Sequence, residues 1–399
     1  MTKNCKHTLE FDTDNNKPSK ISKPHNHNMT QKNSAAGIQR YLVAIEYIGT
    51  HFSGSQKQLS CRTVVGALEE AFTKFIGQAV IVSCSSRTDA GVHALSNVCH
   101  VDIQRTSKRR PGEVLPPHEP SVVRRAVNHF LQKNDSDLTV IDVRCVPLDF
   151  HARFSAQERT YFYRLLSGPE PVSAFEKDRA WHVPEELNLS AMRKTSFIQF
   201  MQEACKVLVG RHDFSSFRAA GCQVASSLQF LNIKCQFYDH IISSLYELSI
   251  NKIALLQATS PIRTLDELSI CEVIPSLYFP NTMDRERHNQ DLNGCHSNSE
   301  TVIPPPSSSA SIDKGTTSTE DIGFGKRRQH RCLVVTARAR SFLYHQVRLL
   351  VGVLKVVGTG NLTIPDVERI LNAKTITAAS PMAPACGLYL GEVKYDLPN

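Results

Sequence analysis

The chain has 399 residues, of which 41% are hydrophobic, enough for about two domains of ordinary size, each with its own core. Lys and Arg number 46 against 38 Asp and Glu, so the formal charge is +8 and an anionic partner such as nucleic acid is favoured. The 12 cysteines include no Cys-x-x-Cys pair, which argues against a zinc site or a disulfide scaffold and for a reducing compartment.

The sequence predicts neither a membrane span nor a targeting signal. No apolar run approaches the roughly 18 residues that a membrane span needs, so we expect a soluble protein. Residues 1–38 are predicted to be a disordered extension. They are polar and contain Glu10, Asp12 and Asp14 but no Arg, which fits neither a secretory signal nor an Arg-rich transit peptide. We therefore expect a protein that is not secreted.

Residues 39–166 are predicted to form an α+β half. In chain order, the patterns indicate a strand at 41–47, a helix with apolar residues at Val65, Leu68, Phe72 and Phe75, strands at 80–84 and 98–103, a helix over 123–130 and a strand at 138–143. This strand, helix, strand, strand, helix, strand order is that of a ferredoxin-like unit. The two central strands flank a polar loop at residues 87–93.

Residues 167–399 are predicted to form a second α+β half, which follows a strand at 161–165. Its predicted elements are a helix over 201–208 that Gly210 ends, a strand within 262–271, a strand at 332–337, a helix over 342–357 that Ser341 caps, a helix at 367–371 behind a Thr363–Asp366 capping box, and a strand at 388–393. The expected fold is thus α+β, with two ferredoxin-like or RRM-like halves, mixed, mainly antiparallel sheets and a central RNA-binding cleft.

Two insertions interrupt this scheme. Residues 224–259 are moderately apolar without a sustained period, and no role is assigned to them. Residues 273–330 contain a Pro-Pro-Pro run, a Ser-Ser-Ser run and many Asn, Asp and Thr residues. Such a segment cannot bury enough apolar surface to order, so we expect it to be disordered.

The loop around Asp89 is the main candidate for chemistry. It is short, polar and contains glycine, and it lies between two apolar strands, where a rigid scaffold can present a carboxylate. Two other interpretations stay open on the loop alone. Asp89 can cap a turn in which Gly91 takes the positive φ. An aspartic-protease loop is weaker, because Ala90 stands in the middle of the triplet and no second triplet occurs.

Five strings in a fixed order give the loop a context. They are SRTDAGVHA at 86–94, FHARFSA with RTYFY at 150–163, HDFSSF at 212–217, SFLYHQVR at 341–348 and APACGLYL at 383–390. Together they resemble the motifs of the TruA family of tRNA pseudouridine synthases, and residues 85–105 look most like its eukaryotic pseudouridylate synthase-like branch. The similarity runs from Arg40 to Tyr395 outside the insertions. The chain departs from the family pattern at Ser86, where a Gly is usual, and near Ser55, where an aromatic residue is expected; neither change removes a reacting group.

This resemblance implies the pseudouridine synthase fold and conversion of uridine to its C-glycoside in tRNA, in the anticodon stem-loop, without a cofactor or a metal. Asp89 matches the catalytic aspartate. It can attack C1′, attack C6 or abstract a ribose proton, and each route needs an ionised carboxylate. Tyr161 matches the active-site tyrosine, whose ring can stack on the base and whose hydroxyl can help to move the C5 proton. An ordinary half-buried strand tyrosine is the alternative.

Arg348 matches the basic residue that pairs with the aspartate in this family. A guanidinium beside a carboxylate in a closed site favours its charged form. On the predicted helix, Phe342, His345 and Leu349 share one face and Arg348 lies beside it, so Arg348 can reach the site while its neighbours pack. The alternative is a solvated helix arginine.

The remaining candidates are contacts to RNA. A uridine inside a stem must be extruded, and Arg87 is the candidate that fills the gap. His93 is expected to be a hydrogen-bonding residue of the loop rather than a base. Predicted phosphate or ribose contacts, each of which can equally be a surface charge, are Arg153, Arg159, Arg211 and Arg218.

Three functions are possible for a chain with these motifs, and the sequence favours the first. The first is the active tRNA isomerase, with a homodimer as a family expectation and a compartment that is mitochondrial by resemblance or else cytosolic or nuclear. The second is an inactive RNA-binding protein or tRNA chaperone, which the joint presence of Asp89, Tyr161 and Arg348 disfavours. The third is a nucleobase deaminase, which needs His-x-Glu and Pro-Cys-x-x-Cys motifs that the sequence lacks.

Overall fold

The computed structural model describes residues 37–134, 137–185, 197–219, 260–273 and 330–397. Most of the predicted N-terminal extension, all of insertion 224–259 and residues 274–329 of the second insertion lie outside these ranges. The predictions made for those segments therefore stay predictions. Among the described residues, no helix is long and apolar enough to cross a membrane.

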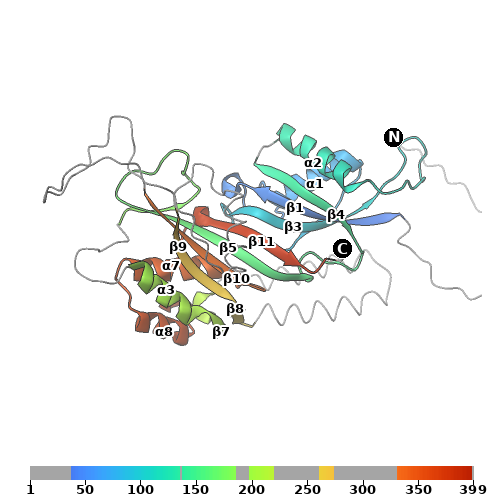
Figure 1. The fold of residues 1–399 in the computed structure, drawn as a ribbon. Coiled ribbons are helices and arrows are strands. Elements are labelled where there is room, and N and C mark those ends of the chain that lie inside the picture. The colour runs from blue at the N-terminus through green and yellow to red at the C-terminus, as the bar shows by residue number, and fades with distance from the viewer. Residues whose placement is uncertain (1–36, 135–136, 186–196, 220–259, 274–329, 398–399) are drawn as a thin grey trace, which may run out of the picture. The chain divides into compact units, whose positions relative to one another are not determined.

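The first half has the predicted ferredoxin-like order. Its elements are β1 (Ile38–Tyr47), α1 (Val64–Ile76), β2 (Val82–Cys84), β3 (His93–Gln104), α2 (Pro120–Asn134) and β4 (Leu138–Val146). β1 pairs antiparallel with β4 and with β3, and β2 pairs antiparallel with β3. Figure 1 shows α1 and α2 side by side next to these strands, and α2 packs on β4. All six elements predicted from the sequence are confirmed.

Helix α1 shows how local sequence fixes an element. Its apolar residues recur at helical spacing, and Val64, Leu68 and Phe72 are fully buried. The side chain of Thr63 accepts a hydrogen bond of 3.2 Å from the backbone N–H of Gly66, which caps the first turn. The helix ends at Gly77, whose φ of 83° is a left-handed conformation that glycine adopts without strain.

The second half supplies the other strands and helices. They are β5 (Ala156–Ser167), β6 (Trp181–Val183), α3 (Phe197–Leu208), β7 (Gly210–Asp213), β8 (Ile262–Leu265), β9 (Glu267–Val273), β10 (Arg331–Ala339), α7 (Gln346–Gly358), α8 (Ile364–Ala373) and β11 (Leu388–Tyr395). Single 3₁₀ turns occur at Gly49–His51, Ser215–Phe217, Ile376–Ala378 and Ala385–Gly387. Helix α3 packs on β9, α7 and α8 (Figure 1). The predicted Thr363–Asp366 capping box starts α8.

One sheet runs through both halves. Its main order is β4-β1-β3-β11-β5-β10-β9, with β2 beside β3 and β6 beside β5. The last strand, β11, makes the connection, because it pairs parallel with β3 and antiparallel with β5. The fold is therefore α+β with a mixed, mainly antiparallel sheet, as expected. The division drawn after residue 166 falls at the end of β5, inside this shared sheet.

Two predicted elements differ from the structure. The strand expected within residues 262–271 is two strands in separate sheets, since β8 pairs with β7 whereas β9 pairs with β10. Between them the backbone N–H of Asp266 bonds to the carbonyl of Arg338 at 2.8 Å, where the chain changes partner. The charged pair Asp266-Glu267 stands at this point, and Leu265 and Leu268 on either side of it do not keep one alternation, so the sequence carried a sign of the break.

The helix predicted over residues 342–357 is shorter. It begins at Gln346, and Ser341 does not cap it; the cap position is held by His345, whose φ of 60° is left-handed. The prediction that Phe342 and His345 share a helical face with Leu349 is therefore wrong. The residues before Gln346 form an irregular turn, in which the backbone N–H of Leu343 bonds to the side-chain oxygen of Gln346 at 2.8 Å.

Candidate active site

Asp89 lies in a tight turn at the end of the sheet, between β2 and β3. The backbone N–H of Val92 bonds to the carbonyl of Asp89 at 3.2 Å, and Gly91 takes a φ of 79°, the positive value predicted for it. The carboxylate remains reachable, with 28% of the side chain exposed. Gly49 packs directly against the turn, because a Cβ there would lie 1.9 Å from the carbonyl oxygen of Val92. Only glycine allows this close approach.

Ser55 holds the loop from one side. It is 1% exposed, and its hydroxyl accepts a hydrogen bond of 2.8 Å from the backbone N–H of Thr88. Its own N–H donates to the Thr88 carbonyl at 3.0 Å. The Thr88 hydroxyl meets the buried hydroxyl of Tyr47 at 2.8 Å. The residue next to Asp89 is thus fixed through both its backbone and its side chain, and a departure from the family pattern, Ser55, supplies part of that support.

Asn97, fully buried on β3, holds the residues that lead into the loop. Its side-chain oxygen accepts from the Ser85 hydroxyl at 2.9 Å, and its amide donates to the Ser86 carbonyl and to the Tyr47 hydroxyl, each at 3.2 Å. Buried polar groups of this kind stabilise a single arrangement when all their partners are present. The loop is therefore a rigid support for Asp89.

Arg159, predicted to contact RNA, lies behind the loop. It is 8% exposed, and its guanidinium donates to the Ser86 hydroxyl at 2.9 Å, to the Ser85 and Arg153 carbonyls at 3.0 Å each, and to the carbonyl of Arg340. Burial lowers its pKa first, and the charge of Arg340 adds to that effect. Because its donors are engaged within the protein, Arg159 joins the loop to β5 and to the end of β10. Ser86, the second departure from the family pattern, is its partner.

Arg348 meets Asp89, although 259 residues separate them in the chain. Its Nη1 lies 3.3 Å from Asp89 Oδ2. Its Nε donates to the carbonyl of Ala383 at 2.8 Å, and the Ala383 N–H returns a bond of 3.1 Å to the Arg348 carbonyl. These two bonds tie the first turn of α7 to the segment before β11. The carboxylate also faces the positive end of a 13-residue helix, which favours a negative charge.

His345 is a partner of Asp89 that the sequence analysis missed. Its Nε2 lies 3.1 Å from Asp89 Oδ2, the oxygen that Arg348 contacts. From the sequence, His345 was expected on the packed face of a helix. In the structure its backbone is left-handed, and the ring lies against the Asp89 loop. The string Tyr344-His345-Gln346 contains neither Gly nor Asn, the usual signals of a left-handed position, and histidine is only a weak signal of one.

Tyr161 is buried beside the same site, with 8% of its surface exposed. Its ring meets Phe342 edge to face, with centroids 5.1 Å apart. Burial raises the pKa of its hydroxyl and the negative charge of Asp89 raises it further, whereas Arg159 and a hydrogen bond with Ser86 act in the opposite direction. The hydroxyl therefore stays protonated at neutral pH. Asp89, Tyr161 and Arg348 were predicted to meet in one site. Asp89 and Arg348 are in contact, and the charge of Asp89 raises the pKa of Tyr161.

His93 makes hydrogen bonds at the end of the loop, as predicted, and its partners lie inside the protein. It is the first residue of β3, is 2% exposed and stacks on Tyr389 with ring centroids 4.6 Å apart. Its Nδ1 accepts from the Gly49 N–H at 3.1 Å, so the proton is on Nε2, which donates to the Asp178 carbonyl at 3.0 Å. Both nitrogens are used inside the protein, and burial lowers the pKa to about 4. His93 therefore supports the loop and is buried away from a bound RNA.

Arg87 and Arg153 form the exposed basic rim of the site. The pKa of Arg153 is lowered, first by the neighbouring protein atoms and then by the positive charges of Arg87 and Arg159. Three guanidinium groups in mutual electrostatic reach favour an anion such as a phosphate. Phe154, 39% exposed, lies beside Arg153, with the guanidinium carbon 5.8 Å from the ring centroid.

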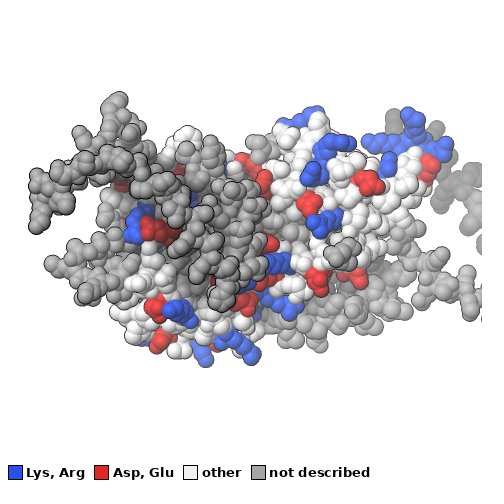
Figure 2. All heavy atoms as spheres, viewed as in Figure 1, with Lys and Arg blue, Asp and Glu red and all other residues white. Residues whose placement is uncertain are grey.

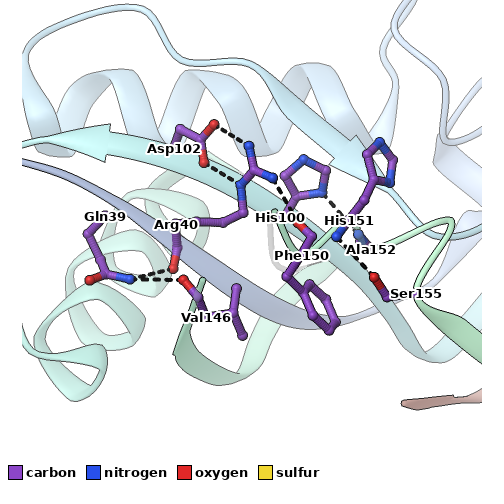
Figure 3. A network of polar contacts seen from close by, with 9 residues as sticks. All are labelled: Gln39, Arg40, His100, Asp102, Val146, Phe150, His151, Ala152 and Ser155. Carbon is purple, nitrogen blue, oxygen red and sulfur yellow. Dashed lines mark hydrogen bonds and ion pairs between the residues drawn. The ribbon is translucent and has the colours of Figure 1, made fainter. Parts of the chain in front are cut away.

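A polar network fixes the turn that carries Arg153 (Figure 3). Arg40 on β1 binds both carboxylate oxygens of Asp102 at 2.6 Å and donates to the Phe150 carbonyl at 2.7 Å. The Nδ1 of His100 accepts from the Ala152 N–H at 3.2 Å, and burial lowers the pKa of His100 to about 4. The network joins residues 150–155 to β1 and β3, so the rim and the Asp89 loop are held on the same strands.

The two predicted contacts in the second half lie on other elements. Arg211 is exposed on β7, and Arg218 is half-buried after the 3₁₀ turn Ser215–Phe217. Figure 2 shows Lys and Arg also gathered beside the start of β1, where the loop after β3 leaves the sheet with Lys108, Arg109 and Arg110 exposed. In the part of the chain that the structure describes, no cluster of three His, Cys, Asp or Glu residues could hold a metal ion.

Known proteins are similar to this chain along most of its length. A family profile described as tRNA pseudouridine synthase matches residues 43–155 and 255–396. Three similar proteins are each named tRNA pseudouridine synthase A. Those of Bartonella tribocorum, Rhodospirillum centenum and Xanthobacter autotrophicus are 30%, 34% and 33% identical over 358 residues, which cover 90% of this chain and 100% of each relative.

Proposed function

The chain belongs to the tRNA pseudouridine synthase family, and on that premise we propose that Asp89 initiates its reaction. The protein is an isomerase that converts uridine in tRNA to pseudouridine. The N1–C1′ bond breaks, the base turns and a C5–C1′ bond forms. The C5 proton leaves and N1 takes up a proton, so the nucleotide gains and loses no atoms.

The observation that carries the proposal is the environment of the Asp89 carboxylate. Two nitrogen donors, on His345 and Arg348, lie within 3.3 Å of its Oδ2, and the side chain is partly open to solvent. The Arg348 guanidinium places a positive charge against the carboxylate. Attack at C1′, attack at C6 and abstraction of a ribose proton all require a carboxylate.

Tyr161 is proposed to stack on the target base and to serve in proton transfer at C5. Its raised pKa keeps the hydroxyl protonated, so its oxygen can take the C5 proton only while the hydroxyl proton passes on to water. Phe342 braces the ring from one edge. The ring is therefore held in one orientation before RNA binds, which reduces the ordering that binding requires.

Arg87 and Arg153 are proposed to contact the RNA around the extruded nucleotide. Extrusion costs a few kcal/mol, which stacking and phosphate contacts must offset. Arg87 is exposed two residues before Asp89, so its guanidinium can occupy the gap that the uridine leaves. Arg211, Arg218 and the exposed basic residues Lys108, Arg109 and Arg110 are proposed as further phosphate contacts. Binding should therefore weaken steeply with salt.

The target is proposed to lie in the anticodon stem-loop, as the resemblance of the five motifs to the family implies. The homodimer remains a prediction, as does the compartment, whether mitochondrial, cytosolic or nuclear.

The test is to incubate the whole protein with unmodified tRNA transcripts and to map new pseudouridines, alongside Asp89→Asn. We expect pseudouridine with the wild type and a loss of at least about 10³-fold with the variant, because the reacting group is removed. Binding of tRNA should change little. A wild type that binds tRNA but forms no pseudouridine would show instead an RNA-binding protein that has lost the reaction.

A further inference from the structure

We propose that His345 is a positioning residue, which together with Arg348 holds Oδ2 of Asp89 so that Oδ1 is the oxygen that acts on the nucleotide. The inference rests on the proposed function of Asp89 and goes beyond it, because it assigns different tasks to the two carboxylate oxygens. The proposed function names His345 only as a contact of the carboxylate and gives it no task of its own. Four features of its surroundings support the positioning role.

The first feature is the distribution of donors. His345 Nε2 and Arg348 Nη1 lie 3.1 and 3.3 Å from Asp89 Oδ2. Among the described residues, no hydrogen bond or ion pair reaches Oδ1. Two donors on one oxygen fix the rotation of the carboxylate and leave the lone pairs of the other oxygen unengaged. A carboxylate held in this way is oriented before the substrate arrives.

The second feature is the backbone of His345. A residue at a helix cap is normally extended and bonds its side chain to the first turn. Here φ is 60°, and the side chain of His345 makes no capping bond. Only a few per cent of residues other than glycine adopt this conformation, histidine more often than most, and such positions gather at functional sites. The conformation directs the imidazole to Asp89 instead of to the helix.

The third feature is the placement of the two ring nitrogens. The Nδ1 atom of His345 is buried and has no hydrogen-bond partner among the described residues. The Nε2 atom lies 3.1 Å from Asp89 Oδ2. The ring therefore presents Nε2, and not Nδ1, to the carboxylate.

The fourth feature is the stacking of the ring. The Tyr344 ring lies against the His345 ring with centroids 3.7 Å apart and planes 27° apart. Tyr344 is itself tied to the chain before the first insertion, because its carbonyl accepts from the Ala219 N–H at 3.2 Å. The stacking therefore fixes the plane of the imidazole, and the contact with Asp89 fixes the direction in which Nε2 points.

Three substitutions separate the contact of His345 Nε2 with Asp89 from the packing of the His345 ring on Tyr344. His345→Phe keeps an aromatic ring against Tyr344 and removes the donor. His345→Gln places an amide N–H near the position of Nε2 without the ring. His345→Asn tolerates the left-handed backbone, but its amide is too short to reach Asp89. Each full-length variant is assayed for kcat and KM with unmodified tRNA, for tRNA affinity and for thermal unfolding.

We expect kcat to fall about 10- to 100-fold in His345→Phe and His345→Asn, less than the roughly 10²- to 10³-fold for a lost oxyanion-hole donor, because His345 acts through Asp89. KM and tRNA affinity should stay within about twofold, because the donor acts on Asp89 and not on the RNA. His345→Gln should recover most of kcat. Full kcat in His345→Phe, or an equal loss in folded His345→Gln and His345→Phe, would overturn the proposal.

A second measurement does not depend on activity or on the folding of His345 variants. In the ¹⁵N-histidine spectrum of the wild type, His345 should be a single tautomer with a slowly exchanging Nε2–H, and this signal should shift and exchange faster in Asp89→Ala. An unchanged signal would refute the contact. A wild type that forms no pseudouridine would refute the proposed function while leaving this signal in place, so the two failures can be told apart.

Discussion

The two sides of the Asp89 site are held in different ways. The acid side, residues 85–89, is bound by buried hydrogen bonds from β1, β3, β5 and the segment before α1, through side chains that include Ser55, Asn97 and Arg159. The basic side is one turn of chain, in which Arg348 depends on the Ala383 carbonyl and His345 on a left-handed backbone. The acid is therefore fixed redundantly, whereas its partners depend on few contacts.

This difference indicates where a single substitution should matter. On the acid side, each lost bond leaves others in place, so the position of Asp89 should survive while stability falls. On the basic side, one lost contact changes the charge or the orientation of the carboxylate itself. We therefore expect losses of activity without losses of stability at the start of α7, and the reverse around the loop.

The largest effect should follow from Arg348→Met, which keeps the length of the side chain and removes the charge. We expect kcat to fall about 10²-fold, because Asp89 loses its cationic partner. Thermal unfolding and tRNA affinity should change little. Single-turnover kinetics with unmodified tRNA measure the loss, and Arg125→Met at an exposed position of α2 is the matched control. Activity within threefold of the wild type would contradict the importance of the pair.

The next largest effect is a loss in the free energy of unfolding as pH falls, which arises from two histidines on the acid side. Burial depresses the pKa of His93 and of His100, both on β3, from 6.5 to about 4. Between these values the unfolded chain binds more protons than the folded one, so their contribution to stability is complete above pH 6.5 and is lost as pH falls toward 4. The linked loss is at most about 3 kcal/mol for each histidine.

Urea unfolding at pH 7.5, 5.5 and 4.5 measures this dependence. His100→Asn keeps an acceptor for the Ala152 N–H but removes the titrating ring, so the free energy of unfolding should fall less steeply between pH 6.5 and 4. His129→Asn, at an exposed position of α2, should leave the slope unchanged. If His100→Asn has the slope of the wild type, His100 is not the titrating group.

The smallest effect should follow from Ser55→Ala. It removes the acceptor for the Thr88 N–H, and we expect a loss of about 1 kcal/mol in the free energy of unfolding. Activity should stay within about threefold, because Tyr47 still holds the Thr88 hydroxyl and Asn97 and Arg159 still hold residues 85 and 86. Urea unfolding and initial rates provide both numbers. A loss of activity as large as that of Arg348→Met would show that the acid side has no redundancy.

The sequence predicted the elements with strong local signals. The apolar periodicity of α1, the Thr363–Asp366 capping box and the positive φ of Gly91 are written in neighbouring residues, and all three are confirmed. The family followed from five strings, and through them the pairing of Asp89 with Arg348 was expected. Contacts that depend on distant chain were not predictable in the same way, as the contact of Asp266 shows, since its partner Arg338 is 72 residues away.

The sequence by itself therefore determined the α+β class and the family and predicted which residues carry the reacting groups, because periodicity, caps and motifs are properties of short stretches. Only the tertiary structure decided the rest. It joined the two halves through β11, buried His93 and Arg159 as supports, and turned His345 toward Asp89. The physical reason is that burial, hydrogen-bond partners and a strained backbone angle are set by residues far apart in the chain, which no local pattern records.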